Sequence, residues 1–242
     1  MENKKFYVVA HRGASGLVEF ENTLESYQKA IDLHCDGIEC DIRKTKDDVI
    51  IMSHDPNIKD MIIKDHTYQE LNEYSTSIGY HLPTLIETLQ LVKGKIMIDI
   101  EIKEEGYEEK ILNEILSVLN VDEFYVRSFY DNAIKKIYDL NSSVKTILLT
   151  GLAHPKPFIR TRYSEVFPKR RLKKCHAYAV SPYYEEMILK YPKRLHKLGY
   201  KVIVWTVNDK ENMKKIINDV DGIITNYPNL LFEVLNENNS VK

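Results

Sequence analysis

Residues 37–55 read GIECDIRKTKDDVIIMSHD, and the stretch begins as an apolar strand that carries two acids, Glu39 and Asp41. Side chains at i and i+2 of a strand share a face, so the two carboxylates are expected roughly 6–7 Å apart. If both face inward, their repulsion is on the order of 2.5 kcal/mol at an effective dielectric constant of about 20. A third acid, Glu101, stands in a similar strand, IMIDIEIK at 96–103. A hard divalent cation with oxygen ligands would remove the repulsion among the three.

The opposite orientation of this strand is also open. Ile38, Cys40 and Ile42 could form its buried face and leave both acids in solvent. The stretch ends in a polar pair, His54-Asp55, directly after the apolar run 49–52. A histidine at the end of a strand is suited to proton transfer near neutral pH, although a simple polar cap is the alternative.

Composition excludes several classes of protein. The chain has 242 residues, of which 43% are hydrophobic and 29% charged, enough for one large α/β domain. The net charge of −2 gives no bias toward nucleic acid, and no nucleic-acid partner is predicted. Three cysteines without a disulfide framework suit a reducing compartment. The apolar stretch before His11 is too short for a signal peptide, and no run approaches the length of a membrane span, so a cytoplasmic location is predicted.

Apolar strand-like runs alternate with amphipathic helical stretches along the chain. The predicted strands are 6–10, 37–42, 95–102, 124–127, 144–149, 177–180, 201–206 and 222–225. The predicted helices are 23–33, 85–93, 108–119, 132–140, 185–198, 210–217 and 230–235. Eight such repeats predict a closed TIM (β/α)8 barrel of the α/β class, with an open doubly wound sheet as the rival. No GxGxxG motif follows the first strand, which argues against a dinucleotide-binding version of that rival.

Two segments depart from the alternation. Residues 46–82 form a short insertion after strand 2, which begins with a hairpin and continues as a polar connector with one short helix near 68–74. Residues 151–176, after the fifth strand, are rich in lysine and arginine. Neither segment has the size of a second domain, and residues 1–242 are predicted to be a single barrel domain.

Polar residues recur where the predicted strands end, which is where TIM barrels carry their active sites. Asp99, Glu101 and Lys103 share one face of strand 95–102, while the isoleucines of the other face suit packing against the outer helices. The charged face is therefore expected to point into the mouth of the barrel, where charges need partners.

Eight pieces of sequence, in order along nearly the whole chain, resemble the glycerophosphodiester phosphodiesterase family. They are His11-Arg12-Gly13, Glu21-Asn22-Thr23, residues 37–55, Pro83-Thr84-Leu85, Glu101-Ile102-Lys103, Ser128-Phe129, VIVWTVN at 202–208 and DGIITNYP at 221–228. Any single piece is weak evidence, whereas the ordered set is specific. The resemblance implies a TIM barrel, one divalent cation, and hydrolysis of glycerophosphodiesters to glycerol 3-phosphate and an alcohol.

The resemblance also implies a role for each part of the site. Glu39, Asp41 and Glu101 would be metal ligands, and their oxygen atoms favour Mg²⁺ or Ca²⁺. His11 and His54 would be the catalytic acid and base. In the family, the glycerol hydroxyl next to the phosphate can attack first and give a cyclic phosphate that water then opens.

Four further residues are implied in substrate binding. Arg12 and Lys103 would place positive charge on the phosphate, although Lys103 could instead be an ion-pair partner of Glu101 or Asp99. Trp205 would form a wall facing the glycerol, with core packing as its alternative, and Phe129 would lie beside the substrate.

Departures from the family pattern concern substrate selection. Phe20 replaces a usual proline, Asp99 stands where asparagine is common, and the connector after His54 is shorter. Lysophospholipase D-like hydrolysis and a non-catalytic phosphate-binding barrel remain as alternative functions. A glycosidase would also use paired carboxylates, but two histidines with two basic residues fit a phosphate better. The alcohol, the choice of metal and the oligomeric state are not specified.

The basic segment 156–174 carries eight lysines and arginines. Phe158, Tyr163 and Phe167 are interleaved with the charges, a pattern that allows shallow insertion among lipid headgroups. We expect weak, salt-sensitive peripheral contact with anionic membranes through this segment. A solvated helix and loop that balances acidic surface elsewhere is the alternative.

Overall fold

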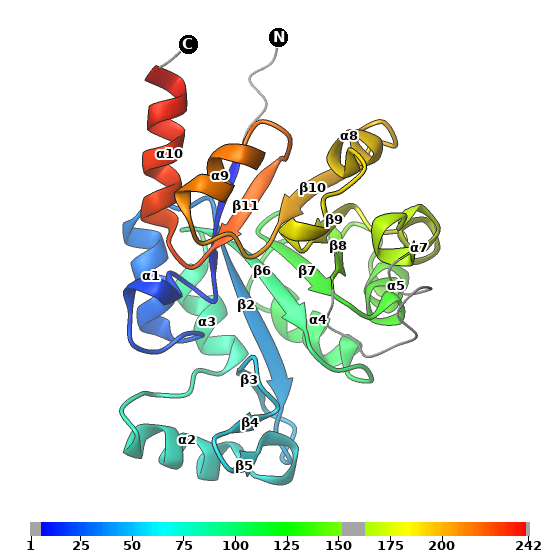
Figure 1. Cartoon of the computed structure of the whole chain (residues 1–242). Coiled ribbons are helices and arrows are strands. Elements are labelled where there is room, and N and C mark those ends of the chain that lie inside the picture. Colours follow the sequence, from blue (N-terminus) through cyan, green and yellow to red (C-terminus); the bar gives the residue numbers. More distant parts are fainter. Residues whose placement is uncertain (1–5, 152–162, 241–242) are drawn as a thin grey trace.

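A closed barrel of parallel strands forms the centre of the molecule (Figure 1). The computed structural model describes residues 6–151 and 163–240. Within these residues the barrel strands are β1 (Tyr7–His11), β2 (Gly37–Lys44), β6 (Met97–Ile102), β7 (Phe124–Ser128), β8 (Thr146–Thr150), β9 (Ala179–Pro182), β10 (Lys201–Val204) and β11 (Gly222–Thr225). Neighbouring strands pair in parallel, and β1 pairs with both β2 and β11, which closes the sheet. The predicted TIM barrel is confirmed, and the open doubly wound sheet is excluded.

Helices surround the barrel on its outside (Figure 1). In the described part of the chain they include α1 (Leu24–Asp32), α3 (Leu85–Val92), α4 (Glu108–Leu116), α5 (Asp131–Leu140), α7 (Lys169–Cys175), α8 (Tyr191–His196), α9 (Lys210–Ile216) and α10 (Pro228–Ser240), whereas α2 (Tyr68–Ser77) lies apart in the insertion. None of the helices among these residues is long and apolar enough to cross a membrane.

One predicted helix, 185–198, is confirmed only in its second half and is wrong in its first half. The chain instead forms a 3-10 turn, η3 (Tyr184–Glu186), and then the short helix α8. Leu189 and Lys190 between them have φ values of 53° and 57°, which lie in the left-handed region. Pro192 lacks an amide hydrogen and is tolerated only in the first turn of a helix, so α8 has to start beside it. The helix α7, in turn, was not predicted as an element because lysine and arginine dominate its sequence.

The alternation of side chains along β6 divides polar from apolar residues as predicted. Ile98, Ile100 and Ile102 are buried in the main core, between the barrel and the outer helices. Asp99 and Glu101 face the other way, into the barrel, and are also buried. A smaller apolar cluster fills the inside of the barrel on its remaining strands; it consists of Val9, Ile147, Ala179, Ile203 and Ile224.

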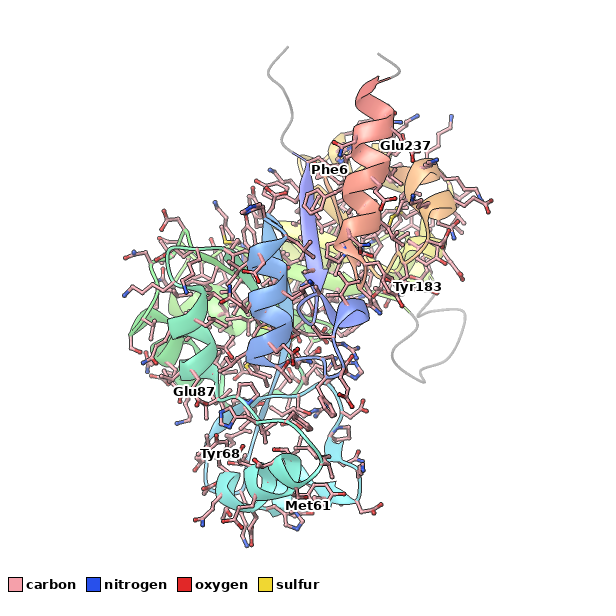
Figure 2. All side chains as sticks on the ribbon, turned by 90° about the vertical axis from the view of Figure 1, so that its left-hand side faces the viewer. Phe6, Met61, Tyr68, Glu87, Tyr183 and Glu237 are labelled. Carbon is pink, nitrogen blue, oxygen red and sulfur yellow. The ribbon has the colours of Figure 1, made fainter. Side chains whose placement is uncertain are left out.

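The insertion, residues 46–82, stands at the end of the molecule away from both termini. Figure 2 shows Met61 and Tyr68 at this end and Phe6 and Glu237 at the other. Because Phe6 precedes the first barrel strand, the insertion lies on the side where the parallel strands end. The predicted hairpin is present: β3 (Ile50–Met52) pairs antiparallel with the end of β2.

The rest of the insertion has its own small core. Two further short strands, β4 (Asn57–Ile58) and β5 (Met61–Ile62), pair antiparallel and were not predicted, because two residues give no readable alternation. The 3-10 turn η2 (Ile63–Asp65) leads to α2, the short helix expected near 68–74. The core residues are Ile51, Ile58, Ile63, Leu71 and Leu82. This packing fixes the position of the chain that carries His54 and Asp55.

Candidate active site

A tight turn directly after the first strand positions the polar residues His11 and Arg12. His11 ends β1, and the next two residues have positive φ, 51° at Arg12 and 80° at Gly13. A Cβ atom at position 13 would lie 2.4 Å from Ser26 Oγ, so only glycine lets the turn pack against α1. Ser26 Oγ donates to the Arg12 carbonyl at 2.9 Å. The turn therefore holds Arg12 in a fixed place over the end of β2.

Three buried carboxylates from β2 and β6 converge inside the barrel. Glu39, Asp41 and Glu101 have at most 7% of their surface exposed. They form the carboxylate cluster, in which one oxygen of each lies within 4.8 Å of those of the others. The orientation with both strand-2 acids in solvent is thus wrong. Converging oxygen atoms at these separations suit a hard divalent cation.

The charges of the carboxylate cluster are unevenly compensated. Burial and the charge of Asp41 raise the pKa of Glu39 well above its usual range. Burial also raises the pKa of Glu101, against the opposite pull of Lys103. At Asp41, burial is outweighed by Lys103 and Arg12, which hold the pKa of that carboxyl below its usual range. Burial therefore favours the protonated form of Glu39 and Glu101, whereas the ion pairs of Asp41 favour its carboxylate.

Two basic side chains face the carboxylate cluster. Lys103 Nζ lies 2.8 Å from Glu101 Oε1 and 3.2 Å from Asp41 Oδ1. Arg12 Nε lies 3.2 Å from Asp41 Oδ2, and Arg12 Nη1 donates to Glu21 Oε1 at 2.7 Å. Both side chains also line the cavity described below, which leaves them beside any ligand that enters it.

His11 is held in one orientation by a residue that follows the neighbouring strand β11. Its Nδ1 lies 2.6 Å from Asn226 Oδ1, just after β11. Because that amide oxygen only accepts, Nδ1 donates, and Nε2 carries the free lone pair. Nε2 is 3.8 Å from Glu39 Oε2. Burial, followed by the charge of Arg12, lowers the pKa of His11 to about 3, so its imidazole is neutral near pH 7.

His54 reaches the same cavity from the insertion. Its Nδ1 lies 2.8 Å from Asp55 Oδ1, and its carbonyl accepts a hydrogen bond from Arg43 Nε at 2.9 Å. Arg43 is in turn paired with Glu104. Burial lowers the pKa of His54, although the charge of Asp41 opposes this. The two histidines therefore come from the end of β1 and from the insertion, and both line one opening.

A cavity of about 360 Å³ connects these groups. Its lining residues are His11, Arg12, Glu39, Arg43, His54, Asp55, Pro56, Glu101, Ile102, Lys103, Arg127, Phe129, Tyr130, Leu149 and Trp205. Asp41 is absent from this lining because it lies beneath Arg12 and Lys103. The volume is that of a small-molecule site.

One side of the cavity is aromatic. The rings of Phe129 and Trp205 meet edge to face, with centroids 5.6 Å apart, and we call this pair the aromatic wall. Tyr183 packs against Trp205 at the same centroid distance. The indole Nε1 donates to the Ser181 carbonyl at 2.9 Å, which fixes the plane of the ring. Trp205 thus contacts both the inner core and the cavity. Core packing and a place in the wall of the cavity, the two roles considered from the sequence, are therefore compatible.

Comparison with known proteins identifies the family. A model of the "Glycerophosphoryl diester phosphodiesterase family" matches residues 11–230. The chain belongs to this family of hydrolases. A glycerophosphodiester phosphodiesterase of Caldanaerobacter subterraneus is 30% identical over 250 residues, covering 96% of this chain and 98% of the relative.

Solved structures agree with that assignment. The glycerophosphodiester phosphodiesterase of Thermotoga maritima superimposes with a TM-score of 0.78 and 27% identity, covering 95% of this chain and 98% of the other. A phosphodiesterase of Oleispira antarctica, in complex with the product sn-glycerol-3-phosphate, gives a TM-score of 0.81 at 20% identity, covering 95% and 96% of the two chains. The second likeness is evidence for the fold.

Several residues of the site were not singled out from the sequence. Asn22 donates to Asp41 Oδ2 at 2.9 Å and orients that carboxylate, and Asn226 orients His11. Both asparagines stand in pieces that carry the family resemblance, which was the available signal. Arg127 forms a buried ion pair with Asp99 inside the barrel, so Asp99 is not the partner of Lys103. Nothing in the sequence marked Arg127, because its role depends on a neighbouring strand.

Proposed function

We propose that this chain hydrolyses glycerophosphodiesters to glycerol 3-phosphate and an alcohol. The observation that carries the proposal is the convergence of His11, His54, Arg12 and Lys103 on one cavity above the carboxylate cluster. The product named in the Oleispira antarctica structure, sn-glycerol-3-phosphate, supports the choice of substrate class.

The carboxylate cluster fits one divalent cation, Mg²⁺ or Ca²⁺. Glu39, Asp41 and Glu101 would hold it, because all three offer oxygen atoms that converge in one buried place. When bound, the cation would polarise the phosphoryl oxygens of the substrate. Arg12 and Lys103 already contact Asp41 and would add positive charge at the same place.

The two histidines would move the protons. His11 has its Nδ1 hydrogen held by Asn226, so its Nε2 can accept a proton from the attacking hydroxyl. His54, held by Asp55 at the other edge of the cavity, would give a proton to the leaving oxygen, and the two histidines would exchange these roles when water opens the cyclic phosphate to glycerol 3-phosphate. The aromatic wall offers an apolar surface for the carbon face of the glycerol and excludes water from it.

The direct test identifies the products. Glycerophosphocholine would be incubated with the protein, and glycerol 3-phosphate and choline measured by ³¹P NMR and a coupled assay. We expect glycerol 3-phosphate and choline, with His11→Ala protein as the inactive control. Release of glycerol and phosphocholine, or no product with any glycerophosphodiester, would overturn the proposal.

The same assay separates the two alternatives. Choline release from lysophosphatidylcholine at a higher kcat/KM than from glycerophosphocholine would favour lysophospholipase D-like activity. Binding of glycerol 3-phosphate without turnover of either compound would favour a non-catalytic barrel. We expect glycerophosphocholine, the smaller of the two compounds, to be the better substrate. The cavity has a volume of about 360 Å³, and the aromatic wall closes one of its sides.

We also propose weak contact with anionic membranes through α7. Lys156, Phe158, Arg160 and Arg162 of the basic segment lie outside the described residues. In α7, Lys169, Arg170, Lys173 and Lys174 are exposed, and so are Tyr163 and Phe167 just before it. Arg171 does not belong to this surface, because it pairs with Asp131 and Glu165.

The membrane test therefore leaves Arg171 unchanged. Lys169, Arg170, Lys173 and Lys174 would all be replaced by glutamate. Wild-type protein should sediment with phosphatidylserine vesicles at low salt and be released by added salt. The variant should stay in solution and still cleave soluble substrates. Equal sedimentation of the two proteins would show that the segment is only a solvated helix.

A further inference from the structure

Arg171 is the centre of a polar network just outside the cavity. Its Nε lies 3.0 Å and 3.3 Å from the two carboxylate oxygens of Asp131, and its Nη2 donates to Asp131 Oδ1 at 2.8 Å. Nη1 donates to Glu165 Oε1 at 3.0 Å. The side chain is only 20% exposed, so these contacts are largely shielded from water. One guanidinium thus ties α7 to the start of α5 and to residue 165.

The same guanidinium contacts the backbone of the aromatic wall. Arg171 Nη2 donates to the carbonyl of Phe129 at 3.3 Å. Phe129 lies two residues before Asp131, so the arginine holds this short stretch of chain at two points. The position of the Phe129 ring depends on the direction of that backbone.

The second ring of the wall is connected to Arg171 through Glu165. Glu165 Oε2 accepts a hydrogen bond of 2.7 Å from the amide of Gly151, directly after β8. Trp205 lies close over Gly151: a Cβ atom added there would be 3.0 Å from the indole Cζ2. The backbone at Gly151 is therefore the surface on which the indole rests, and Glu165 holds it in place.

We propose that Arg171 is a positioning residue, which sets the aromatic wall by holding the Phe129 backbone directly and the Gly151 backbone through Glu165. The kinetic consequence of this role rests on the proposed function: the affinity for the substrate depends on Arg171, whereas the phosphoryl chemistry does not. Within the described residues, the side chain of Arg171 donates to Asp131, Glu165 and Phe129, and these residues belong neither to the carboxylate cluster nor to the pair of histidines.

The test variant is Arg171→Lys, with Arg170→Lys as its matched control. Lysine keeps the positive charge but has a single nitrogen, which cannot contact Asp131, Phe129 and Glu165 together in the planar arrangement of arginine. Arg170 is the neighbouring residue on α7 and is exposed. Asp131→Asn is the second variant, should Arg171→Lys not fold, because it removes the charge that binds Nε and Nη2.

The first readout does not require activity. Trp205 is the only tryptophan in the chain, so intrinsic fluorescence reports on the wall itself. We expect acrylamide to quench Trp205 more strongly in Arg171→Lys and Asp131→Asn than in wild type, and Arg170→Lys to match wild type. Unchanged quenching in both variants would overturn the proposal, whatever the substrate of the protein.

The second readout is the division of the effect between KM and kcat. For glycerophosphocholine, Arg171→Lys should raise KM about tenfold, which corresponds to about 1.4 kcal/mol, and change kcat less than KM. In a Trp205→Ala background the same replacement should have little further effect on KM, because the wall is already lost. A fall in kcat with unchanged KM, or full additivity with Trp205→Ala, would contradict the positioning role. Absence of turnover in wild type would refute the proposed function alone, because the quenching result stands separately.

Discussion

The two halves of the barrel interior differ in chemistry. On β2, β6 and β7 the inward side chains are charged and buried: Glu39, Asp41, Asp99, Glu101 and Arg127. On β8, β9, β10 and β11 they are mostly apolar, and Ile147, Ala179, Ile203 and Ile224 pack together. We propose that the charged half carries groups that act on a phosphate, while the apolar half gives them a surrounding of low dielectric constant, in which ionic contacts are stronger. The proposed site requires both halves: the charged groups and the apolar surroundings next to them.

The largest effect is expected from removing a charge from the charged half. Asp41→Asn keeps the size of the side chain but removes a proposed metal ligand and the charged partner of Lys103 and Arg12. We expect kcat to fall by about 10³-fold or more, since several kcal/mol of charge stabilisation are lost. Circular dichroism should show a folded protein. The exposed Asp60→Asn serves as the control, and activity within a few-fold of wild type in Asp41→Asn would refute the role of the cluster.

The histidines at the boundary are expected to come next. His11→Ala and His54→Ala should each lower kcat by roughly 10²–10⁴-fold, the usual contribution of general acid–base catalysis. The melting temperature should change little, because each ring contacts the cavity on one side. His81→Ala, at an exposed position, should behave as wild type. If either site variant keeps a near-normal kcat, that histidine is only a polar cap.

A smaller and different effect is expected from the apolar half. Trp205→Ala removes one side of the aromatic wall and should raise KM for glycerophosphocholine by roughly tenfold, with a lesser change in kcat. Trp205→Phe should recover most of the affinity, because a ring remains beside Phe129. Steady-state kinetics on the three proteins would decide. A loss of kcat as large as that of the histidine variants would mean that the two halves do not have separate roles.

The smallest effect is expected from a residue in neither half. Thr84 caps α3 by accepting from the Glu87 amide, while Glu87 accepts from the Thr84 amide in return. Thr84→Ala should cost about 1 kcal/mol of stability and lower the melting temperature by about 2–4 °C. Both kcat and KM should stay at wild-type values. Thermal unfolding and kinetics on one preparation would check this. A change in KM would show that the structure at the junction of insertion and barrel affects substrate binding.

The charged half could be anticipated from the sequence because its information is local. Glu39 and Asp41 are two residues apart in one strand, and so are Glu101 and Lys103, which fixes each pair to one face. The parallel order of the strands then brings the two pairs together. The prediction of eight strands succeeded for the same reason, since each strand is a separate apolar run.

The apolar half could be anticipated only in part. Phe129 and Trp205 were named, but their orientation depends on Arg171, Glu165 and Gly151, which are distant in sequence from both rings. The Asp99–Arg127 pair joins two strands and leaves no pattern in either. The break before α8 depends on two left-handed residues that are neither glycine nor asparagine, so no local pattern of residues marks it.

The central claim is that the carboxylate cluster acts through a divalent cation, and one measurement tests it most directly. The rate of glycerol 3-phosphate release from glycerophosphocholine would be followed after exhaustive chelation, and again after adding Mg²⁺ or Ca²⁺, with the metal content of the protein determined in each sample. We predict that chelation abolishes turnover and that one of the two ions restores it. Full activity in excess chelator, with no metal retained by the protein, would contradict the claim.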